Sequence, residues 1–513
     1  MKIVTAALCA VLLATMIGSR TLTAAASCES LASMMLLNTT VRASMVDAGA
    51  FAPALPTGAT ATQGSPAASQ MFRNLPAFCR VTATIEPSSD SDIKVEIWLP
   101  ASGWNGKLQA VGNGAWAGVI SYAAMAAALR GGYATASTDT GHAGNGGDAS
   151  FAFNHPEKLV DFAYRAVHEM TVRSKLVIEK HYGSPPKVSY WNGCSTGGRQ
   201  GLKEAQKFPE DYDGIIAGAP ANYMTHLLSH SIWVAQASLK DPASLIPREK
   251  YAAVHQAALD ACDALDGVKD RVIDDPTRCR FDPKAIQCTG ADAATCLTAP
   301  QVDAARKIYA PATNSKGAVL FPGLEPGSEP GWSGLAGSAP LSIAATYFKY
   351  PVFKNPDWDF KTLDFDKDVD MIDKQDGGLL NATDPNLRPF FSRGGKLLMY
   401  HGWTDQLIAP RNSINYYTSV VKAIGGVDKA TESIRLFMVP GMAHCAGGDG
   451  TSTFDSMAAI EQWVEQKKAP AQIQASHMSN GVADRTRPLC LYPAVAVYRG
   501  SGDTNDAANF TCR

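Results

Sequence analysis

The sequence predicts an α/β fold, in which a parallel sheet with crossover helices is interrupted by a second, inserted domain. Three observations predict it. Strand-like and helical stretches alternate over residues 27–220, the alternation stops at 221–390, and it resumes over 391–513. Such alternation is typical of a parallel sheet covered by helices. At 513 residues the chain is long enough for one large core with an insertion.

The elements of the first part follow one another in the order that this fold requires. Runs rich in β-branched and apolar residues predict strands, and apolar residues at helical spacing predict helices. The predicted strands are 81–85, 93–99, 107–111, 133–138 and 187–191, and the predicted helices are 159–180 and 198–208. The first two strands are separated by a polar turn, which predicts a hairpin.

Residues 221–390 form the predicted inserted domain. They contain four cysteines, much of the proline and glycine-rich stretches without a regular pattern. Strands expected at 396–400 and 434–439 then return the chain to the core. We therefore expect one core made of residues 27–220 and 391–513.

The composition and the first residues exclude several classes of function. Lys and Arg number 46 against 48 Asp and Glu, a net charge of -2, without the basic surplus of nucleic-acid-binding proteins. Residues 1–26 read as a signal peptide, with Lys2, an apolar run too short to span a bilayer, and the small residues 24–26. We expect a secreted or periplasmic protein with no nucleic-acid or membrane partner; its oligomeric state is not predicted.

Cysteine usage agrees with export. Of 11 cysteines, Cys9 lies in the signal, and the ten that remain are an even number, which favours five disulfides in an oxidising compartment. Connectivity does not follow from the count alone. Spacing favours Cys262–Cys279, Cys288–Cys296 and Cys490–Cys512 as local closures, which leaves Cys28, Cys79, Cys194 and Cys445 for long-range pairs.

The run Gly193-Cys194-Ser195-Thr196-Gly197 has the pattern GxSxG between a predicted strand and a predicted helix. This is the context of the nucleophile elbow of α/β-hydrolases, where glycines permit a sharp turn and the helix N-terminus favours developing negative charge. A structural glycine turn and attack by Cys194 are the alternatives. The elbow presents its middle residue, so Ser195 is the candidate nucleophile.

A serine nucleophile needs a base and an acid, and in this architecture they follow it in the order acid, then histidine. Asp405 follows the strand at 396–400, and His444 follows the strand at 434–439. His401 is the main rival base, although it lies where the acid is expected, and His142 is a weaker rival.

The residues beside these candidates sharpen the prediction. Cys194 precedes Ser195 and Cys445 follows His444, so a Cys194–Cys445 disulfide is feasible if the serine and the histidine meet. Cys28 and Cys79 would then form the fifth bridge.

An oxyanion hole needs two preorganised donors. The N–H of Thr196 is the first expected donor. Gly114, in the glycine-rich turn after the strand at 107–111, is the favoured second donor, and Ala115 is the alternative.

Taken together, the Cys-Ser pair in a GxSxG elbow, the later Asp and the His-Cys pair resemble the tannase and feruloyl esterase family, to which bacterial mono(2-hydroxyethyl) terephthalate hydrolase also belongs. The resemblance spans essentially the whole mature chain. It implies an α/β-hydrolase core with a large inserted lid domain, the triad Ser195, Asp405 and His444, and the Cys194–Cys445 bridge. It also implies a secreted serine esterase that hydrolyses feruloyl, other hydroxycinnamoyl or galloyl esters through an acyl-enzyme.

The resemblance further implies a structural calcium ion in the lid and no organic cofactor. Read from the residues alone, the acidic loop concerned is more often simply solvated. The implied ligands are the carboxylates of Asp263, Asp266 and Asp270 and the carbonyls of Val268 and Val272, a set of hard oxygen donors.

Lid residues also bear on the substrate. Family members that act on terephthalate half-esters use a lid arginine, whereas residues 331–351 contain Lys349 but no arginine. Phenolic esters therefore come ahead of the half-ester. The stretch also holds four aromatic residues that form either a wall for an aromatic ring or ordinary lid core: Trp332, Tyr347, Phe348 and Tyr350. A peptidase or lipase, and a calcium-stabilised binding module with an inactive triad, are the remaining alternatives.

Overall fold

The computed structural model describes residues 26–53 and 66–513, so the predicted signal peptide, residues 1–26, lies outside the described residues apart from its last position. A nine-stranded sheet forms the centre of the fold. Its strands are β1 (Thr39–Val46), β2 (Phe78–Ile85), β3 (Ile93–Pro100), β4 (Lys107–Val111), β5 (Ala134–Thr138), β6 (Val188–Cys194), β7 (Gly214–Gly218), β10 (Lys396–Gly402) and β11 (Ile434–Val439).

The spatial order of the strands is β1-β2-β3-β5-β4-β6-β7-β10-β11. Strands from β5 to β11 pair in parallel, and β1, β2 and β3 add an antiparallel edge. The sheet therefore confirms the predicted α/β class, with the predicted hairpin as β2 and β3. The carboxyl ends of β6, β10 and β11 lie along one edge of the sheet, where ligands bind in such folds.

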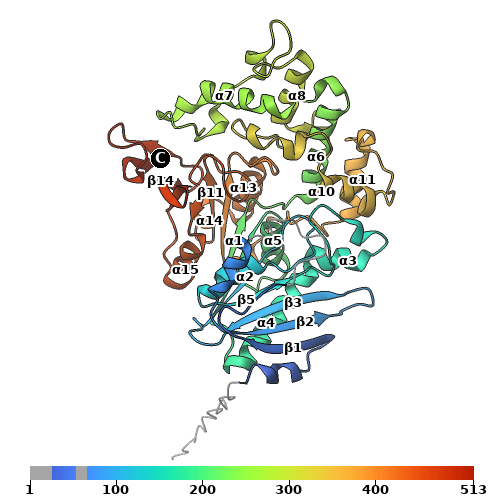
Figure 1. The fold of residues 1–513 in the computed structure, drawn as a ribbon, viewed down its shortest axis with the longest axis vertical. Helices are drawn as coiled ribbons and strands as arrows, with labels where there is room; N and C mark the ends of the chain where they lie inside the picture. Colours follow the sequence, from blue (N-terminus) through green and yellow to red (C-terminus); the bar gives the residue numbers. More distant parts are fainter. Residues whose placement is uncertain (1–25, 54–65) are drawn as a thin grey trace, which may run out of the picture.

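Helices cover both faces of the sheet, as alternating side chains of its strands require. In β10, Leu397 and Met399 belong to one apolar cluster with α4 (Ala166–Tyr182), while Leu398 belongs to a second cluster with α15 (Ser456–Gln466). The predicted helix 159–180 is α3 (Pro156–Val160), a π-helical turn and α4 in succession. Figure 1 shows the sheet strands with these helices around them.

The chain between β7 and β10 adds no strand to this sheet. Its regular elements are mostly helices, and it supplies most residues of an apolar cluster (Figure 1, green to orange). Its elements are α6 (Met224–Leu239), α7 (Tyr251–Cys262), α8 (Ala299–Tyr309), the hairpin of β8 (Ala312–Thr313) and β9 (Val319–Phe321), α9 (Ser333–Ala336), α10 (Ser342–Tyr347), α11 (Lys367–Asp376) and α12 (Arg388–Ser392). The expected limits of the insertion, 221 and 390, thus lie just after β7 and within α12.

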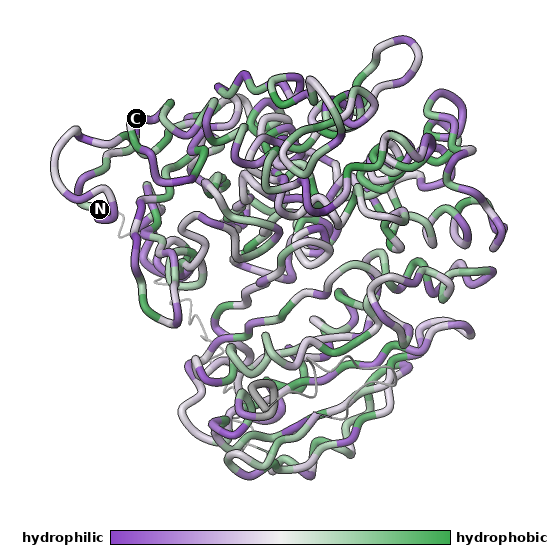
Figure 2. Tube along the Cα trace, turned by 45° about the horizontal axis from the view of Figure 1, so that its top comes forward, coloured by the Kyte–Doolittle hydropathy of each residue, from purple (hydrophilic) through white to green (hydrophobic). Residues whose placement is uncertain are grey.

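Ten further helices and strands lie in the described part of the chain. They are α1 (Pro66–Arg73), α2 (Tyr122–Arg130), α5 (Thr196–Lys207), α13 (Arg411–Ile424), α14 (Val427–Ala430), β12 (Thr453–Phe454), β13 (Gln472–Ser479), β14 (Val482–Cys490), β15 (Ala496–Tyr498) and β16 (Phe510–Cys512). Figure 2 shows hydrophilic segments gathered in the outer loops. Among the described helices, none combines the length and apolarity needed to cross a membrane.

Five disulfides join the predicted pairs. Three close short loops, one ties the N-terminal segment to β2, and one links two loops at the edge of the sheet. They are Cys262–Cys279, Cys288–Cys296, Cys490–Cys512, Cys28–Cys79 and Cys194–Cys445. The last of them closes 251 residues of chain and therefore positions distant segments relative to one another.

Candidate active site

Ser195 occupies a strained turn between β6 and α5. Its backbone angles are φ 63° and ψ -123°, a region that residues with a side chain rarely adopt. A Cβ on Gly193 would lie 2.5 Å from the backbone of Gly197, and one on Gly197 would lie 3.1 Å from the carbonyl oxygen of Asn113. The two glycines of the motif are thus required by close backbone packing, and the turn holds Ser195 at the N-terminus of α5.

Asp405 and His444 form a hydrogen-bonded pair at the ends of two neighbouring strands. Asp405 follows β10 and is fully buried, and its Oδ2 lies 2.7 Å from Nδ1 of His444, which follows β11. The backbone N–H groups of Leu407 and Ile408 donate to its other oxygen at 2.8 and 2.9 Å. The carboxylate is therefore fixed, and it holds the proton of His444 on Nδ1, which leaves Nε2 able to accept one.

This environment determines the charge of both side chains. Burial alone would raise the pKa of Asp405, but the charges and hydrogen bonds of His444 and His401 outweigh burial and hold that pKa well below its usual range. Burial opposes protonation of His444, yet the adjacent Asp405 carboxylate raises the pKa of His444 above its ordinary value. Asp405 thus stays ionised and stabilises a positive charge on the His444 ring.

The rival bases lie in other positions. His401 is fully buried in β10, with Nε2 3.1 Å from Oδ2 of Asp405 and Nδ1 2.7 Å from Oγ of Ser413, so it supports the acid. This positioning contact was missed, although the four-residue spacing from Asp405 is a signal that could have suggested it. His142 is buried with Nε2 2.7 Å from the carbonyl oxygen of Trp116, and burial lowers the pKa of His142 to about 4.

Ser195 and His444 face one cavity. Both side chains line a space of about 50 Å³, and their neighbours Cys194 and Cys445 are bonded with Cα atoms 6.0 Å apart. Among the described residues no direct hydrogen bond joins the Ser195 hydroxyl to the His444 ring. In unliganded sites such bonds are often long and shorten when substrate binds.

The loop after β4 also borders this cavity, through Ala115. Thr196 and Ala115 line it, and the Thr196 hydroxyl donates to the carbonyl oxygen of Ala115 at 3.0 Å. Ala115 has a positive φ of 49°, which turns this loop sharply beside α5. Gly114, the favoured second donor, is not among the residues that line the cavity, whereas its neighbour Ala115 is.

Comparison with known proteins decides the family. A model of the family described as tannase and feruloyl esterase matches residues 79–513. The chain belongs to this family. Its members' activity makes the chain a carboxylic ester hydrolase, and its fold is that of the α/β-hydrolases.

Several relatives are similar over most of their length. An uncharacterised esterase of Xanthomonas campestris is 38% identical over 96% of this chain and 92% of its own. A probable feruloyl esterase B-1 of Aspergillus flavus is 35% identical over 85% of this chain and 86% of its own. The crystal structure of feruloyl esterase B from Aspergillus oryzae has a TM-score of 0.86 at 32% identity and covers 95% of this chain and 99% of its own. Tannin acyl hydrolase from Aspergillus niger shares the fold, with a TM-score of 0.77 at 22% identity over 94% of each chain.

The remaining lining of the cavity is aliphatic except for the hydroxyl of Ser231. These residues come from the start of the inserted segment, from residues 341–343, and from the turn after Asp405. They are Ala221, Met224, Leu227, Leu228, Ser231, Leu341, Ile343, Leu407 and Ile408. None of the four lid aromatics lies among them. Trp332, Tyr347 and Phe348 are buried in apolar clusters that the inserted segment shares with the rest of the chain, so they are core residues and do not line this cavity.

The acidic loop after α7 contains the implied calcium ligands. The carboxylate of Asp263 accepts the N–H groups of Asp270 and Arg271 at 3.2 and 3.1 Å, and Asp266 accepts the N–H of Val268 at 2.9 Å. Gly267 has a φ of 91°, which permits the tight bend between these residues. These hydrogen bonds close the loop on itself.

Carboxylates so close in sequence repel one another unless a cation offsets their charge. Burial, together with the charges of Asp270 and Asp263, raises the pKa of Asp266 to about 6. Arg487 pairs with Asp270 at 2.6 Å and offsets part of the charge. In the described chain these three carboxylates do not converge within 4.8 Å of one another. The oxygen donors fit Ca²⁺ by their chemistry, and their side chains would turn inward to bind it.

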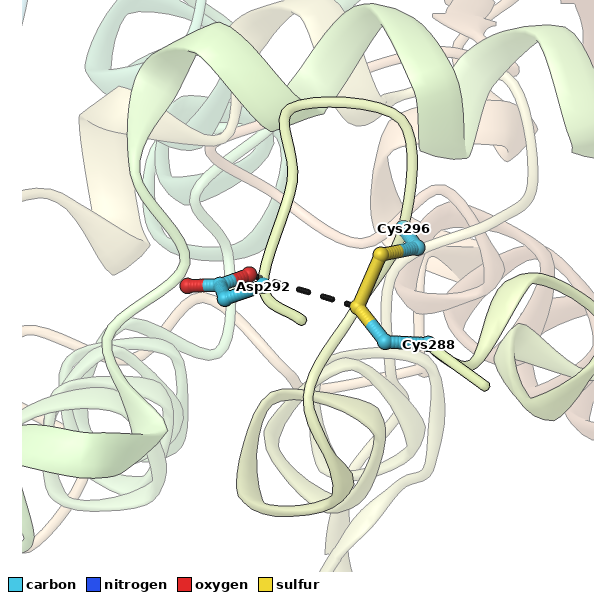
Figure 3. A group of neighbouring side chains, drawn as sticks. All are labelled: Cys288, Asp292 and Cys296. Atoms are coloured by element: carbon cyan, nitrogen blue, oxygen red, sulfur yellow. Dashed lines mark hydrogen bonds between the residues drawn. A yellow bond between two sulfur atoms is a disulfide. The ribbon is translucent and has the colours of Figure 1, made fainter. Parts of the chain in front are cut away.

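Two other groups of metal-ligating side chains lie within 4.8 Å of one another in the described part of the chain: Cys288, Asp292 and Cys296, and His168, Glu204 and Asp211. Figure 3 shows that the two sulfurs of the first group are bonded to each other. A disulfide sulfur is no thiolate, so this group does not make a metal site.

Proposed function

We propose that Ser195 is the catalytic nucleophile, His444 its general base and Asp405 the acid that orients the base. One observation carries the proposal. Asp405 and His444 are hydrogen-bonded, and the Cys194–Cys445 disulfide connects the loop of His444 to the strained turn of Ser195. The order along the chain and the strand, turn and helix around Ser195 are those of an α/β-hydrolase.

The proposed reaction is acyl transfer in two halves. Oγ of Ser195 attacks the ester carbonyl carbon while Nε2 of His444 takes the hydroxyl proton, which gives a tetrahedral oxyanion. When this intermediate collapses, the C–O bond of the ester breaks and the alcohol leaves with the proton from His444. Water then attacks the acyl-enzyme, His444 takes a proton from it, and the free acid leaves as the proton returns to Ser195.

The surroundings supply two electrostatic contributions. The N–H groups of Thr196 and Ala115 are the proposed donors to the oxyanion, with Gly114 as the alternative to Ala115. Both donors belong to backbone that is already fixed, so little reorganisation is needed as charge develops. The ionised Asp405 stabilises the imidazolium form of His444 that exists between the two proton transfers.

The substrate that the cavity favours is an ester of an aromatic acid with few polar substituents. Its aliphatic lining suits a hydroxycinnamoyl ring, whereas a galloyl ring would bury three hydroxyl groups against Leu and Met side chains. Apart from His444, no described lining residue carries a charge that could pair with the carboxylate of a terephthalate half-ester. Hydroxycinnamoyl esters therefore rank first, in agreement with the names of the relatives.

Side chains must move when such a substrate binds. A space of about 50 Å³ is far below the roughly 300 Å³ or more of a usual ligand pocket. Leu341 and Ile343, which come from the inserted segment, line the same cavity as Ser195 and are the candidates to be displaced. The inserted segment would thus act as a lid over the catalytic serine.

Two further proposals concern stability and location. The acidic loop is proposed to bind a structural Ca²⁺ ion through Asp263, Asp266, Asp270 and the carbonyls of Val268 and Val272, which would neutralise the repulsion there. The signal-like N-terminus and five disulfides support export to an oxidising compartment.

The test compares kcat/KM for methyl ferulate, methyl gallate and mono(2-hydroxyethyl) terephthalate. We expect methyl ferulate to be hydrolysed fastest and S195A to lose at least about 1,000-fold in kcat with its fold intact. A faster rate on either of the other two esters would refute the substrate assignment. Unchanged activity of S195A would refute the triad.

A further inference from the structure

A group of three metal-ligating side chains lies at the C-terminal end of α5, the helix that follows Ser195. His168 belongs to α4, Glu204 to α5, and Asp211 to the turn that follows α5. One potential ligand atom from each lies within 4.8 Å of the other two. Nδ1 of His168 is 2.7 Å from Oδ2 of Asp211. An imidazole and two carboxylates thus point at one another from three separate segments.

Glu204 is the unusual member of this group. It is 1% exposed, and neither of its carboxylate oxygens has a hydrogen-bond partner among the described residues. Burial without a hydrogen-bond partner is strongly unfavourable for the ionised form of a carboxyl group. Its oxygen is nevertheless directed at Asp211, a second carboxylate. Such an arrangement needs a shared proton or a cation between the two acids.

Among the described residues no cationic side chain makes a hydrogen bond to Glu204. The ammonium group of Lys175 is bound to backbone, at 3.2 Å from the carbonyl oxygen of Glu210 and 2.5 Å from that of Asp211. His168 already pairs with Asp211, and its ring stacks on Phe208 with centroids 3.7 Å apart. The His168 side chain is 24% exposed, so a small ion can reach the group from solvent.

We propose that His168, Glu204 and Asp211 form a binding site for a divalent transition-metal ion, with Zn²⁺ as the best match. Imidazole nitrogen and carboxylate oxygen are both zinc ligands, and water through the open side would complete a tetrahedron around these three donors. Tetrahedral geometry places ligand atoms about 3.3 Å apart, so the pair of His168 and Asp211 has to open by roughly 0.6 Å.

The ion would connect α4, α5 and the turn after α5. Because α5 begins directly after Ser195, the site would anchor the far end of the helix that carries the elbow. This role is structural and does not depend on the catalytic proposal. It is also separate from the acidic loop, whose donors are all oxygens and belong to the inserted segment.

The test uses the full mature chain without a histidine tag, stripped with EDTA and then saturated with Ca²⁺ to occupy the acidic loop. Isothermal titration with ZnCl₂ should give one site per chain, and Zn²⁺ should raise the melting temperature. Co²⁺ should give visible d–d absorption with imidazole and carboxylate ligation. E204Q, which keeps the shape of the side chain, and H168Q should each weaken Zn²⁺ binding more than about tenfold.

D266N is the matched control, because it removes a carboxylate from the acidic loop and should leave the zinc site intact. The proposal is overturned if the wild-type chain takes up no Zn²⁺ and melts at the same temperature in Zn²⁺ and EDTA; a proton shared between Glu204 and Asp211 would then account for the buried pair. The proposal is also overturned if E204Q and H168Q bind Zn²⁺ as tightly as the wild type, or if D266N alone no longer binds Zn²⁺.

Discussion

Removing the Cys194–Cys445 disulfide is the most informative perturbation of the core. The bridge closes 251 residues. A chain-entropy model of the unfolded state assigns such a loop about 5.5 kcal/mol of stability. An unfolding entropy of about 2.1 cal/mol/K per residue gives roughly 1.1 kcal/mol/K for a chain of this length. The double variant C194A/C445A should therefore melt about 5 °C lower than the wild type.

The same variant should lose activity well below its melting temperature. The bridge ties the turn of Ser195 to the loop of His444, and misplacement of catalytic groups by 1 Å can cost about 100-fold in rate. We expect kcat to fall by about 10- to 100-fold in steady-state assays with methyl ferulate at 25 °C.

The double variant C288A/C296A is the matched control. Its bridge spans only 8 residues, which corresponds to about 2.5 kcal/mol and roughly 2 °C, and it lies outside the catalytic cavity. It should keep the wild-type kcat. Equal melting shifts for the two variants, or an unchanged kcat in C194A/C445A, would refute the reasoning that this disulfide holds the catalytic loops together.

Three other predictions follow from the site. Because Asp405 raises the pKa of His444 and the base must be neutral, kcat/KM should fall as the pH drops through a midpoint above 6.5, and D405N should move that midpoint down; a wild-type midpoint below 6.5 would contradict this. Removal of Ca²⁺ with EGTA should lower the melting temperature by roughly 3 °C, which is the stabilisation expected from Ca²⁺ at 100 times its Kd. The D266N variant should show no such decrease. Equal decreases in the wild type and in D266N would exclude the acidic loop as the calcium site. Leu341→Ala should enlarge the cavity and raise the ratio of kcat/KM on methyl ferulate to kcat/KM on p-nitrophenyl acetate several-fold, a difference in activation free energy of about 1 kcal/mol. An unchanged ratio would mean that Leu341 does not limit access of the larger ester.

Ionisation of Asp405 also contributes to stability. Its pKa is lower in the folded chain than in the unfolded chain, so its contribution is fully present above the unfolded value near 3.8 and is lost as the pH falls through the folded value. The proposed triad acid is therefore also a stabilising group at neutral pH.

Sequence patterns predicted the elements whose signals are local. The GxSxG run located the elbow because close backbone packing at Gly193 and Gly197 permits no side chain. Strand β11 has the predicted bounds, since its residues are almost all apolar or β-branched. Strand β7, Gly214–Gly218, was missed because it is five residues long with two glycines, which reduce strand propensity. Gly218 is required there by Tyr400, whose ring would lie 2.2 Å from an added Cβ, a contact between distant segments.

Side-chain roles that depend on three-dimensional packing were harder to predict. His401 could be recognised as a support for Asp405 only once β10 placed it behind the acid. Ala115 lines the cavity and Gly114 does not, because the chain turns at Ala115. The positive φ of Ala115 could not be predicted from the local sequence. The meeting of His168, Glu204 and Asp211 likewise depends on how α4 packs against α5.

Labelling with a fluorophosphonate probe tests the central claim most directly. The claim is that the hydroxyl of Ser195 is activated by the imidazole of His444. We predict one covalent adduct per chain, mapped to Ser195 by mass spectrometry of peptides, and labelling at least about 100-fold slower in H444Q. An adduct at another residue, or equal labelling rates for the wild type and H444Q, would contradict the account.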